Sequence, residues 1–241
     1  FLHAKGVSDN DILEQYTPFG HSDWQTIVSD VKDFASAGKP TAVVSTINGD
    51  ANVPFYKELA SQGISAEDIP VVAFSVGEEE LSGLDTEPLV GHLAAWNYFM
   101  SVDNDTNANF IEKWHEFIGS EDRTTNDPME AHYIGFQMWV QAVKQAGTTN
   151  VDAVRQAMYG QTVGALSGYD SVMNTNHHLS KPVMIGEIQP DGQFDVVWQT
   201  DEVVKGDAWS DYIPERAKLV ADWTFPWVCG NCAAPRFSAS E

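Results

Sequence analysis

Three segments in the first third of the chain have the composition of buried β-strands. They are DILEQYTP (11–18), TAVVSTI (41–47) and IPVVAFSV (69–76), each rich in β-branched or aromatic residues. Between them, apolar residues recur at helical spacing in SDWQTIVSDVKDFASAGK (22–39) and NVPFYKELASQG (52–63). This alternation predicts a parallel sheet with helices on its faces.

The middle of the chain has a mostly helical pattern. It predicts helices in NANFIEKWHEFIG (107–119), DPMEAHYIGFQMWVQAVKQAG (127–147) and NVDAVRQAMYG (150–160). Asp127 is the expected N-cap of the longest one, as Ser22 is of the first helix in the chain. Apolar residues surround most of the circumference of helix 127–147, so we expect it to be buried.

Strand patterns return near the end of the chain. KPVMIGEIQPDGQFDVVWQT (181–200) predicts a hairpin that turns at Pro190, Asp191 and Gly192. A β/α segment, a helical segment and a second β segment together predict two lobes, with the chain crossing between them more than once.

The charge of the protein narrows the classes of partner. The 241 residues include 13 Lys plus Arg and 35 Asp plus Glu, which gives a net charge of −22. Such a field repels phosphate backbones and anionic membrane surfaces, so nucleic acid is excluded as a partner. No apolar run has the roughly 18 to 20 residues that a membrane-spanning helix needs, so we expect no direct membrane insertion.

Ser75 has three possible roles. AFSVG (73–77) is one residue away from the G-x-S-x-G elbow of hydrolases, with Asp85, His92 and His178 as candidate partners of a nucleophile. Alternatively, Ser75 contacts a ligand, because ligands of open α/β sheets sit at the carboxyl ends of the strands. The third possibility is that Ser75 only forms a turn.

A second polar loop follows the preceding strand. In STINGDAN (45–52), Thr46, Asn48 and Asp50 supply a hydroxyl, an amide and a carboxylate around Gly49, which permits close approach of the backbone. Two polar loops after adjacent strands favour a binding site. The alternative role of Asp50 and Asn52 is to cap the following helix.

Several other residues have both a functional and a structural interpretation. For the two histidines of NHH (176–178), loop or packing roles are favoured over metal binding, because adjacent residues of a strand point to opposite faces and cannot easily bind one ion together. The acids of GEEE (77–80) suit the start of a helix, and Glu78 is also a candidate ligand acceptor. Trp96 and Tyr98 fit the core or a cleft wall. The pair in CGNC (229–232) fits a disulfide, a redox pair or free thiols.

Several blocks of the chain together resemble the urea-binding periplasmic proteins of bacterial ABC importers, which are type I periplasmic binding proteins. They keep their order along almost the whole chain and are YTPFGHSDWQTIV, VSTINGDANVPFYKEL, VVAFSVGEEEL, GHLAAWNYFMSVD, NDPMEAHYIGF and NHHLSKPVMIGEIQPDGQFDVVW. The resemblance implies an α/β fold with two lobes of parallel sheet flanked by helices.

The resemblance also implies how the chain is divided. Residues 1–90 plus 163–205 would form the second, discontinuous lobe, and 91–162 a helical part of a first lobe that is incomplete in this chain. Residues 206–241 would be a C-terminal tail. A signal peptide is expected upstream, and the location is expected to be the periplasm. With export, the CGNC pair is expected to form a Cys229–Cys232 disulfide.

The resemblance finally implies a function. Thr46, Asn48, Gly49 and Asp50 match one ligand-binding loop, and Ser75, Val76 and Glu78 match the next. The expected ligand is urea or a similar short-chain amide, the expected partner is an ABC transporter permease, and no cofactor, metal or reaction is implied. The alternatives are a small-amide hydrolase that uses Ser75 and an amide-sensing regulator on the same fold.

Overall fold

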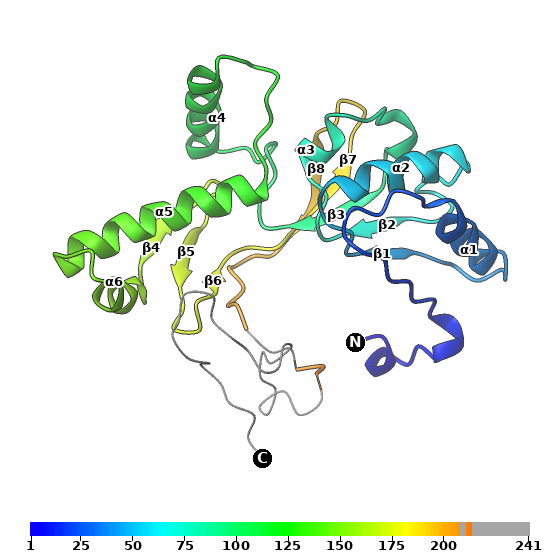
Figure 1. Ribbon diagram of the computed structural model, residues 1–241, viewed down its shortest axis with the longest axis horizontal. Helices are drawn as coiled ribbons and strands as arrows, with labels where there is room; N and C mark the ends of the chain where they lie inside the picture. Colours follow the sequence, from blue (N-terminus) through cyan, green and yellow to red (C-terminus); the bar gives the residue numbers. More distant parts are fainter. Residues whose placement is uncertain (208–210, 214–241) are drawn as a thin grey trace, which may run out of the picture.

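The computed structural model describes residues 1–207 and 211–213, which form two bodies (Figure 1). The first body is built on a five-stranded sheet with the order β1-β2-β3-β7-β8. β1 to β3 are parallel, and β7 and β8 continue the sheet antiparallel. The strands are β1 (Val43–Ser45), β2 (Val71–Ala73), β3 (Leu93–Trp96), β7 (Met184–Ile188) and β8 (Phe194–Gln199).

Helices pack against one face of this sheet (Figure 1). Trp24, Phe55 and Leu59 are buried there against Val71 and Ala73. Complete burial of a side chain such as Leu59 contributes about 1.5 to 3 kcal/mol. The helical segments of the first body are α1 (Gln25–Ala35), α2 (Asn52–Ser61), α3 (Glu78–Leu81) and the short 3-10 turns η1 (His3–Lys5), η2 (Asp9–Asp11), η3 (Gly49–Ala51) and η4 (Glu87–Leu89).

The second body combines three helices with a small antiparallel sheet of order β4-β5-β6. Ile134 and Met138 of its longest helix pack on Val163 and Ala165 next to the small sheet. The elements are α4 (Asp105–Ile118), α5 (Asp127–Ala146), α6 (Val151–Met158), β4 (Thr162–Gly164), β5 (Asp170–Met173) and β6 (Leu179–Ser180). The chain passes between the bodies twice, through residues 97–104 and 181–183 (Figure 1).

The α/β fold, the helices and the hairpin agree with the sequence predictions, and the hairpin turns at Pro190–Gly192 as expected. The expected strand at 11–18 is wrong. Its first residue, Asp11, ends the turn η2, residues 12–18 pair with no strand in the described part of the chain, and Tyr16 is 85% exposed. A strand needs a hydrogen-bonded partner, and a hollow separates this segment from β1.

Three expectations about helices also need correction. Asn126, not Asp127, is the N-cap of α5, and its side-chain oxygen accepts a hydrogen bond from the Met129 amide. Ser22 is not the cap of α1, which begins after Trp24. Helix α5 is not buried all round, because Phe136 is 59% exposed on the side opposite the small sheet.

The two bodies do not coincide with the residue ranges expected for the two lobes. β3 belongs to the large sheet, although it falls in the range 91–162. β4 packs against α5, although most of it falls in the range 163–205. The assignment of these bodies to lobes therefore stays a prediction. Most of the tail (206–241), including Cys229 and Cys232, lies outside the described residues.

Candidate functional site

The two predicted polar loops lie side by side at the carboxyl ends of β1 and β2. Thr46, Asn48, Gly49 and Asp50 are all exposed, and Gly49 has a left-handed backbone with φ of 61°. A residue with a Cβ is disfavoured in that conformation, which explains the glycine. In the described part of the chain, the side chains of Thr46, Asn48 and Asp50 make no hydrogen bond within 3.5 Å. They are therefore free to bind a ligand.

Asn52 holds the two loops together. Its buried amide group donates hydrogen bonds to the carbonyl oxygens of Ile47 at 2.9 Å, Gly49 at 3.2 Å and Ser75 at 3.2 Å. The sequence pointed only to a helix cap at this residue. Its place directly after the loop STINGDA was the one signal of a role in shaping the site.

Ser75 is committed to the same loop contact. Its hydroxyl donates a hydrogen bond to the carbonyl oxygen of Ile47, so the proton is not directed at a base. The proposed partners of a nucleophile are occupied elsewhere. His92 is buried and its Nδ1 accepts from the Val71 amide at 3.1 Å, and His178 bonds to the backbone of Asn176. This arrangement does not form a catalytic triad.

Val76, which follows Ser75, is hydrogen-bonded to Trp96. The side chain of Val76 is fully buried, and its carbonyl oxygen accepts a hydrogen bond from the indole N–H of Trp96. Trp96 is half-buried at the end of β3. Both backbone and side chain of Val76 are thus occupied by packing and bonding within the protein.

Glu78 differs from the exposed residues of the loops because its side chain is only 1% exposed. Oε1 accepts a hydrogen bond from the Met100 amide at 2.6 Å, whereas Oε2 has no partner among the described residues. Burial is the main reason that the pKa of Glu78 is raised to about 7; the negative charges of Glu80 and Asp127 act in the same direction, and backbone hydrogen bonds, that of Met100 first, act against it. The pKa of Glu78 is therefore raised towards neutral pH.

A buried ionic cluster adjoins Glu78 where the chain passes between the bodies. Lys181 Nζ lies 2.5 Å from Glu130 Oε2 and 3.8 Å from Asp127 Oδ2. Asp127 Oδ2 also accepts the Asn97 amide at 2.9 Å. Burial raises the pKa of both carboxyls despite the nearby ammonium group. The sequence analysis missed this cluster, since its members are far apart in the chain.

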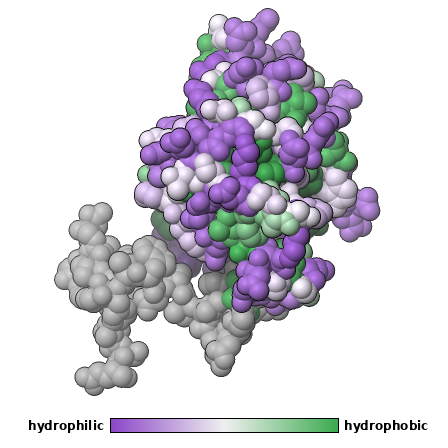
Figure 2. All heavy atoms as spheres, turned by 90° about the vertical axis from the view of Figure 1, so that its right-hand side faces the viewer, coloured by the Kyte–Doolittle hydropathy of each residue, from purple (hydrophilic) through white to green (hydrophobic). Residues whose placement is uncertain are grey.

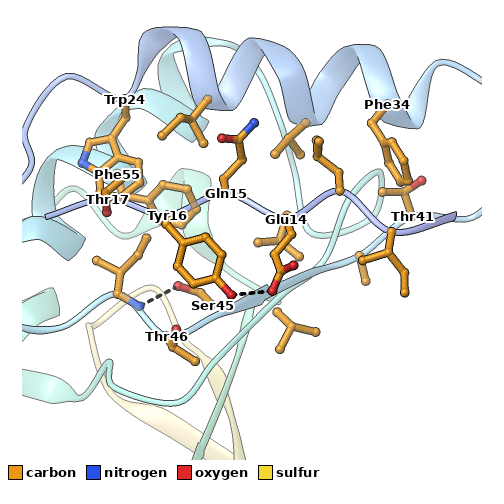
Figure 3. Close-up of a pocket in the computed structure, with 18 of the residues that line it drawn as sticks. Glu14, Gln15, Tyr16, Thr17, Trp24, Phe34, Thr41, Ser45, Thr46 and Phe55 are labelled. Atoms are coloured by element: carbon orange, nitrogen blue, oxygen red, sulfur yellow. Dashed lines mark hydrogen bonds between the residues drawn. The ribbon is translucent and has the colours of Figure 1, made fainter. Parts of the chain in front are cut away.

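A hollow of about 930 Å³ lies beside β1 and reaches the first loop (Figure 3). Thr46 and Asn48 contribute to its wall. Tyr16 and Glu14, both from the segment before α1, also line it, and the Tyr16 hydroxyl donates a hydrogen bond to Glu14 at 2.5 Å. The rest of the wall is largely apolar and includes Ile27, Val31, Phe34 and Phe55. A ligand with few polar atoms would contact mainly this apolar wall, whereas a small polar ligand is better matched by the loops.

The histidines at 177 and 178 lie in the turn between β5 and β6, and the ring of His177 bonds to the Tyr159 hydroxyl at 2.9 Å. Within residues 1–207 and 211–213, no three His, Cys, Asp or Glu side chains are grouped so that they could hold a metal ion. The described helices include none that is long and apolar enough to span a bilayer.

A family model described as a periplasmic binding protein domain matches residues 1–215. The chain therefore belongs to this family, and its α/β architecture is the type I periplasmic binding protein fold. This agrees with the fold class that the sequence motifs implied.

Solved structures share the fold at low sequence identity. An amino acid ABC transporter substrate-binding protein from Pseudomonas fluorescens Pf-5 has a TM-score of 0.67 and 19% identity, over 87% of this chain and 54% of that one. A solute-binding protein of an ABC transporter from Rhodopseudomonas palustris HaA2, in complex with p-hydroxybenzoic acid, has a TM-score of 0.65 and 18% identity, over 76% and 50%. The chain thus spans about half the length of these proteins.

One relative is named as an enzyme and not as a binding protein. A limonene hydroxylase from Geobacillus stearothermophilus is 32% identical over 114 residues, which are 47% of this chain and 21% of that protein. The similarity is thus confined to about a fifth of the hydroxylase.

Proposed function

We propose that this member of the periplasmic binding protein family is the solute-binding protein of an ABC importer and captures urea or a similar short-chain amide. The observation that carries the proposal is the pair of loops at the ends of β1 and β2. There Thr46, Asn48 and Asp50 expose polar side chains that have no hydrogen-bond partner among the described residues. Polar groups that converge at strand ends are typical of ligand sites in open α/β folds.

The chemistry of the loops favours a neutral amide over a carboxylate. Urea has four N–H donors and one carbonyl acceptor, so its site needs mostly acceptors. Asp50, Asn48 and Thr46 supply acceptor oxygens, and the last two also supply donors. The seven proposed residues, Thr46, Asn48, Gly49, Asp50, Ser75, Val76 and Glu78, include no Lys or Arg. A carboxylate bound here would meet acidic groups instead of a cation.

The seven residues divide into two kinds. Thr46, Asn48, Gly49 and Asp50 face solvent and would contact the ligand directly. Ser75, Val76 and Glu78 each make a hydrogen bond within the protein, so their part is to hold the second loop in place. The hollow beside β1 is far larger than urea, which also favours the loops as the contact surface.

Binding without a reaction is the expected activity. The Ser75 hydroxyl is committed to the Ile47 carbonyl oxygen, and none of its nominated partners is bonded to it. Nucleophilic catalysis requires a base within hydrogen-bond reach of the nucleophile. The hydrolase alternative therefore lacks support from the geometry.

The proposed transport role implies a partner protein and a cellular compartment. An ABC transporter permease would receive the solute in the periplasm. Ligand capture would close two lobes, of which residues 1–90 plus 163–205 form the second and 91–162 belong to the first. The predominantly hydrophilic face in Figure 2 and the net charge of −22 fit a protein that stays in an aqueous compartment. A cytoplasmic regulator on the same fold would bind the same ligand but no permease.

Calorimetric titration with urea, acetamide and benzoate tests the proposal. We expect saturable heat from the two amides and none from benzoate, with no ammonia released on prolonged incubation. Saturable binding of benzoate with no response to amides would overturn the ligand assignment. Release of ammonia would overturn the assignment as a non-enzyme.

A further inference from the structure

Buried charged groups gather where the chain passes between the two bodies. Lys181 lies in the second crossing and Asn97 in the first, and the side chain of Asn97 donates to the carbonyl oxygen of Pro182. Asp127 and Glu130 belong to the second body, in the first turn of α5, and both form ion pairs with Lys181. The two crossings are thus joined to each other and to the start of α5. We call this region, formed by residues 97–104, 181–183 and the first turn of α5, the junction.

Glu78 reaches this junction from the first body. Its Oε1 accepts the amide of Met100, which lies in the first crossing. The start of α3 also lies close to the start of α5, because the Cβ of Asn126 is 3.6 Å from the position that a Cβ at residue 77 would take. Any change that moves α3 relative to α5 must therefore disturb the surroundings of Glu78.

The charges of the junction do not balance. Three carboxyls, those of Glu78, Asp127 and Glu130, are each at most 7% exposed, and Lys181 is the one basic side chain among the described residues that is bonded to any of them. The charged groups that act on Glu78 are Glu80 on its own helix and Asp127 on α5, and Glu78 in turn acts on the Tyr98 hydroxyl of the first crossing. Its Oε2 has no partner in the described residues, so backbone hydrogen bonds such as that of Met100 to Oε1, and no cation bonded to it there, offset a charge on this carboxyl.

We propose that Glu78 is a proton-operated latch between the two bodies, closed when its carboxyl is neutral and released when it ionises. When neutral, it accepts the Met100 amide without placing a second negative charge beside Asp127. When ionised, it must either stay charged in a dry contact or move apart from α5 into water, and the second choice opens the junction. The latch is independent of which solute the protein binds.

The raised pKa of about 7 supports this role and fixes the direction of the pH effect. In the open junction the carboxyl is hydrated and regains its ordinary pKa of 4.5, so the closed form binds more protons between the two values. Closure is therefore fully favoured below about pH 4.5, weakens as the pH rises to about 7, and changes little beyond.

Hydrogen exchange of the Met100 amide in the complete chain tests the latch. Between pH 5 and pH 7, the opening equilibrium should rise at least about tenfold beyond the intrinsic change in exchange rate. In the Glu78→Gln variant, the side-chain oxygen still accepts the amide but cannot titrate, so this extra rise should disappear. Glu116→Gln is the control, because Glu116 is an exposed carboxylate of α4 that is not among the groups acting on Glu78, and it should keep the native pH response.

An equal pH response in Glu78→Gln and the native protein would overturn the proposal, because a merely structural role of the side chain would leave the profile unchanged. Should Glu78→Gln fail to fold, carbon NMR of the Glu78 carboxyl in the native protein decides instead. A midpoint near pH 7 that moves together with shifts of the Met100 amide supports the latch, and a midpoint near pH 4.5 contradicts it.

Discussion

The loops at the ends of β1 and β2 and the junction between the bodies are both rich in polar groups, but they use them in opposite ways. In the loops, Thr46, Asn48 and Asp50 are exposed and have no bonded partner among the described residues. In the junction, Lys181 and Glu130 are buried and bonded to each other.

This difference separates two tasks. Exposed polar groups lose little when they exchange water for a ligand, so they can bind reversibly. Buried charges need fixed partners, so changing one alters the fold. Substitutions in the junction should thus change stability first, and substitutions in the loops should change binding first.

The largest effect is expected for Lys181→Met. The variant leaves Asp127 and Glu130 buried without a cation, which should lower the free energy of unfolding by about 3 to 5 kcal/mol. Guanidinium unfolding at pH 7 measures it. Lys144→Met, on the exposed side of α5, is the control and should change stability by less than about 0.5 kcal/mol. Equal effects of the two substitutions would show that the cluster does not stabilise the junction.

A smaller loss is expected for Asn52→Ala. Without the amide, the carbonyl oxygens of Ile47, Gly49 and Ser75 each lose a donor, which should cost about 1 to 3 kcal/mol of stability. Because the loops also lose their common anchor, affinity for the solute should fall in parallel. Asn109→Ala, an exposed asparagine of α4, provides the comparison. A stable Asn52→Ala protein with native affinity would contradict the anchoring role.

Ser75→Ala should have a moderate effect of about 1 kcal/mol, on stability or on solute affinity, because it removes one neutral hydrogen bond to Ile47. Calorimetry and thermal unfolding measure the two contributions. A native rate of ammonia release in the wild-type protein that vanishes in the variant would instead identify Ser75 as a nucleophile.

The smallest effect on stability is expected for Thr46→Ala and Asp50→Asn, within about 0.5 kcal/mol, because both side chains are exposed. Their effect on binding should be clear, with roughly a tenfold loss of affinity for each lost hydrogen bond of about 1.4 kcal/mol. A loss of stability without a loss of affinity would place these residues with the junction and remove them from the site.

The elements with strong local signals could be predicted from the sequence. Apolar periodicity and the terminal Gly147 gave α5, and the turn at Pro190–Gly192 gave the β7–β8 hairpin. The loops after β1 and β2 were predicted because carboxyl ends of neighbouring parallel strands meet at one edge.

Features that depend on distant partners could not be predicted. The segment at 11–18 has strand composition but has no strand partner among the described residues, and a ladder cannot be inferred from one strand. The junction joins Glu78 to Asp127 and Lys181, which only the tertiary fold brings together.

The most direct test of the account is a urea titration of the native protein and of its Asp50→Asn and Lys144→Met variants. The native protein should bind urea saturably, and Asp50→Asn should bind it roughly tenfold more weakly, as expected when one hydrogen bond of about 1.4 kcal/mol is lost. Lys144→Met, an exposed residue of α5 away from the loops, should keep the native affinity. Equal affinity of all three proteins would show that the loops are not the site, and absence of saturable binding by the native protein would contradict urea as the solute.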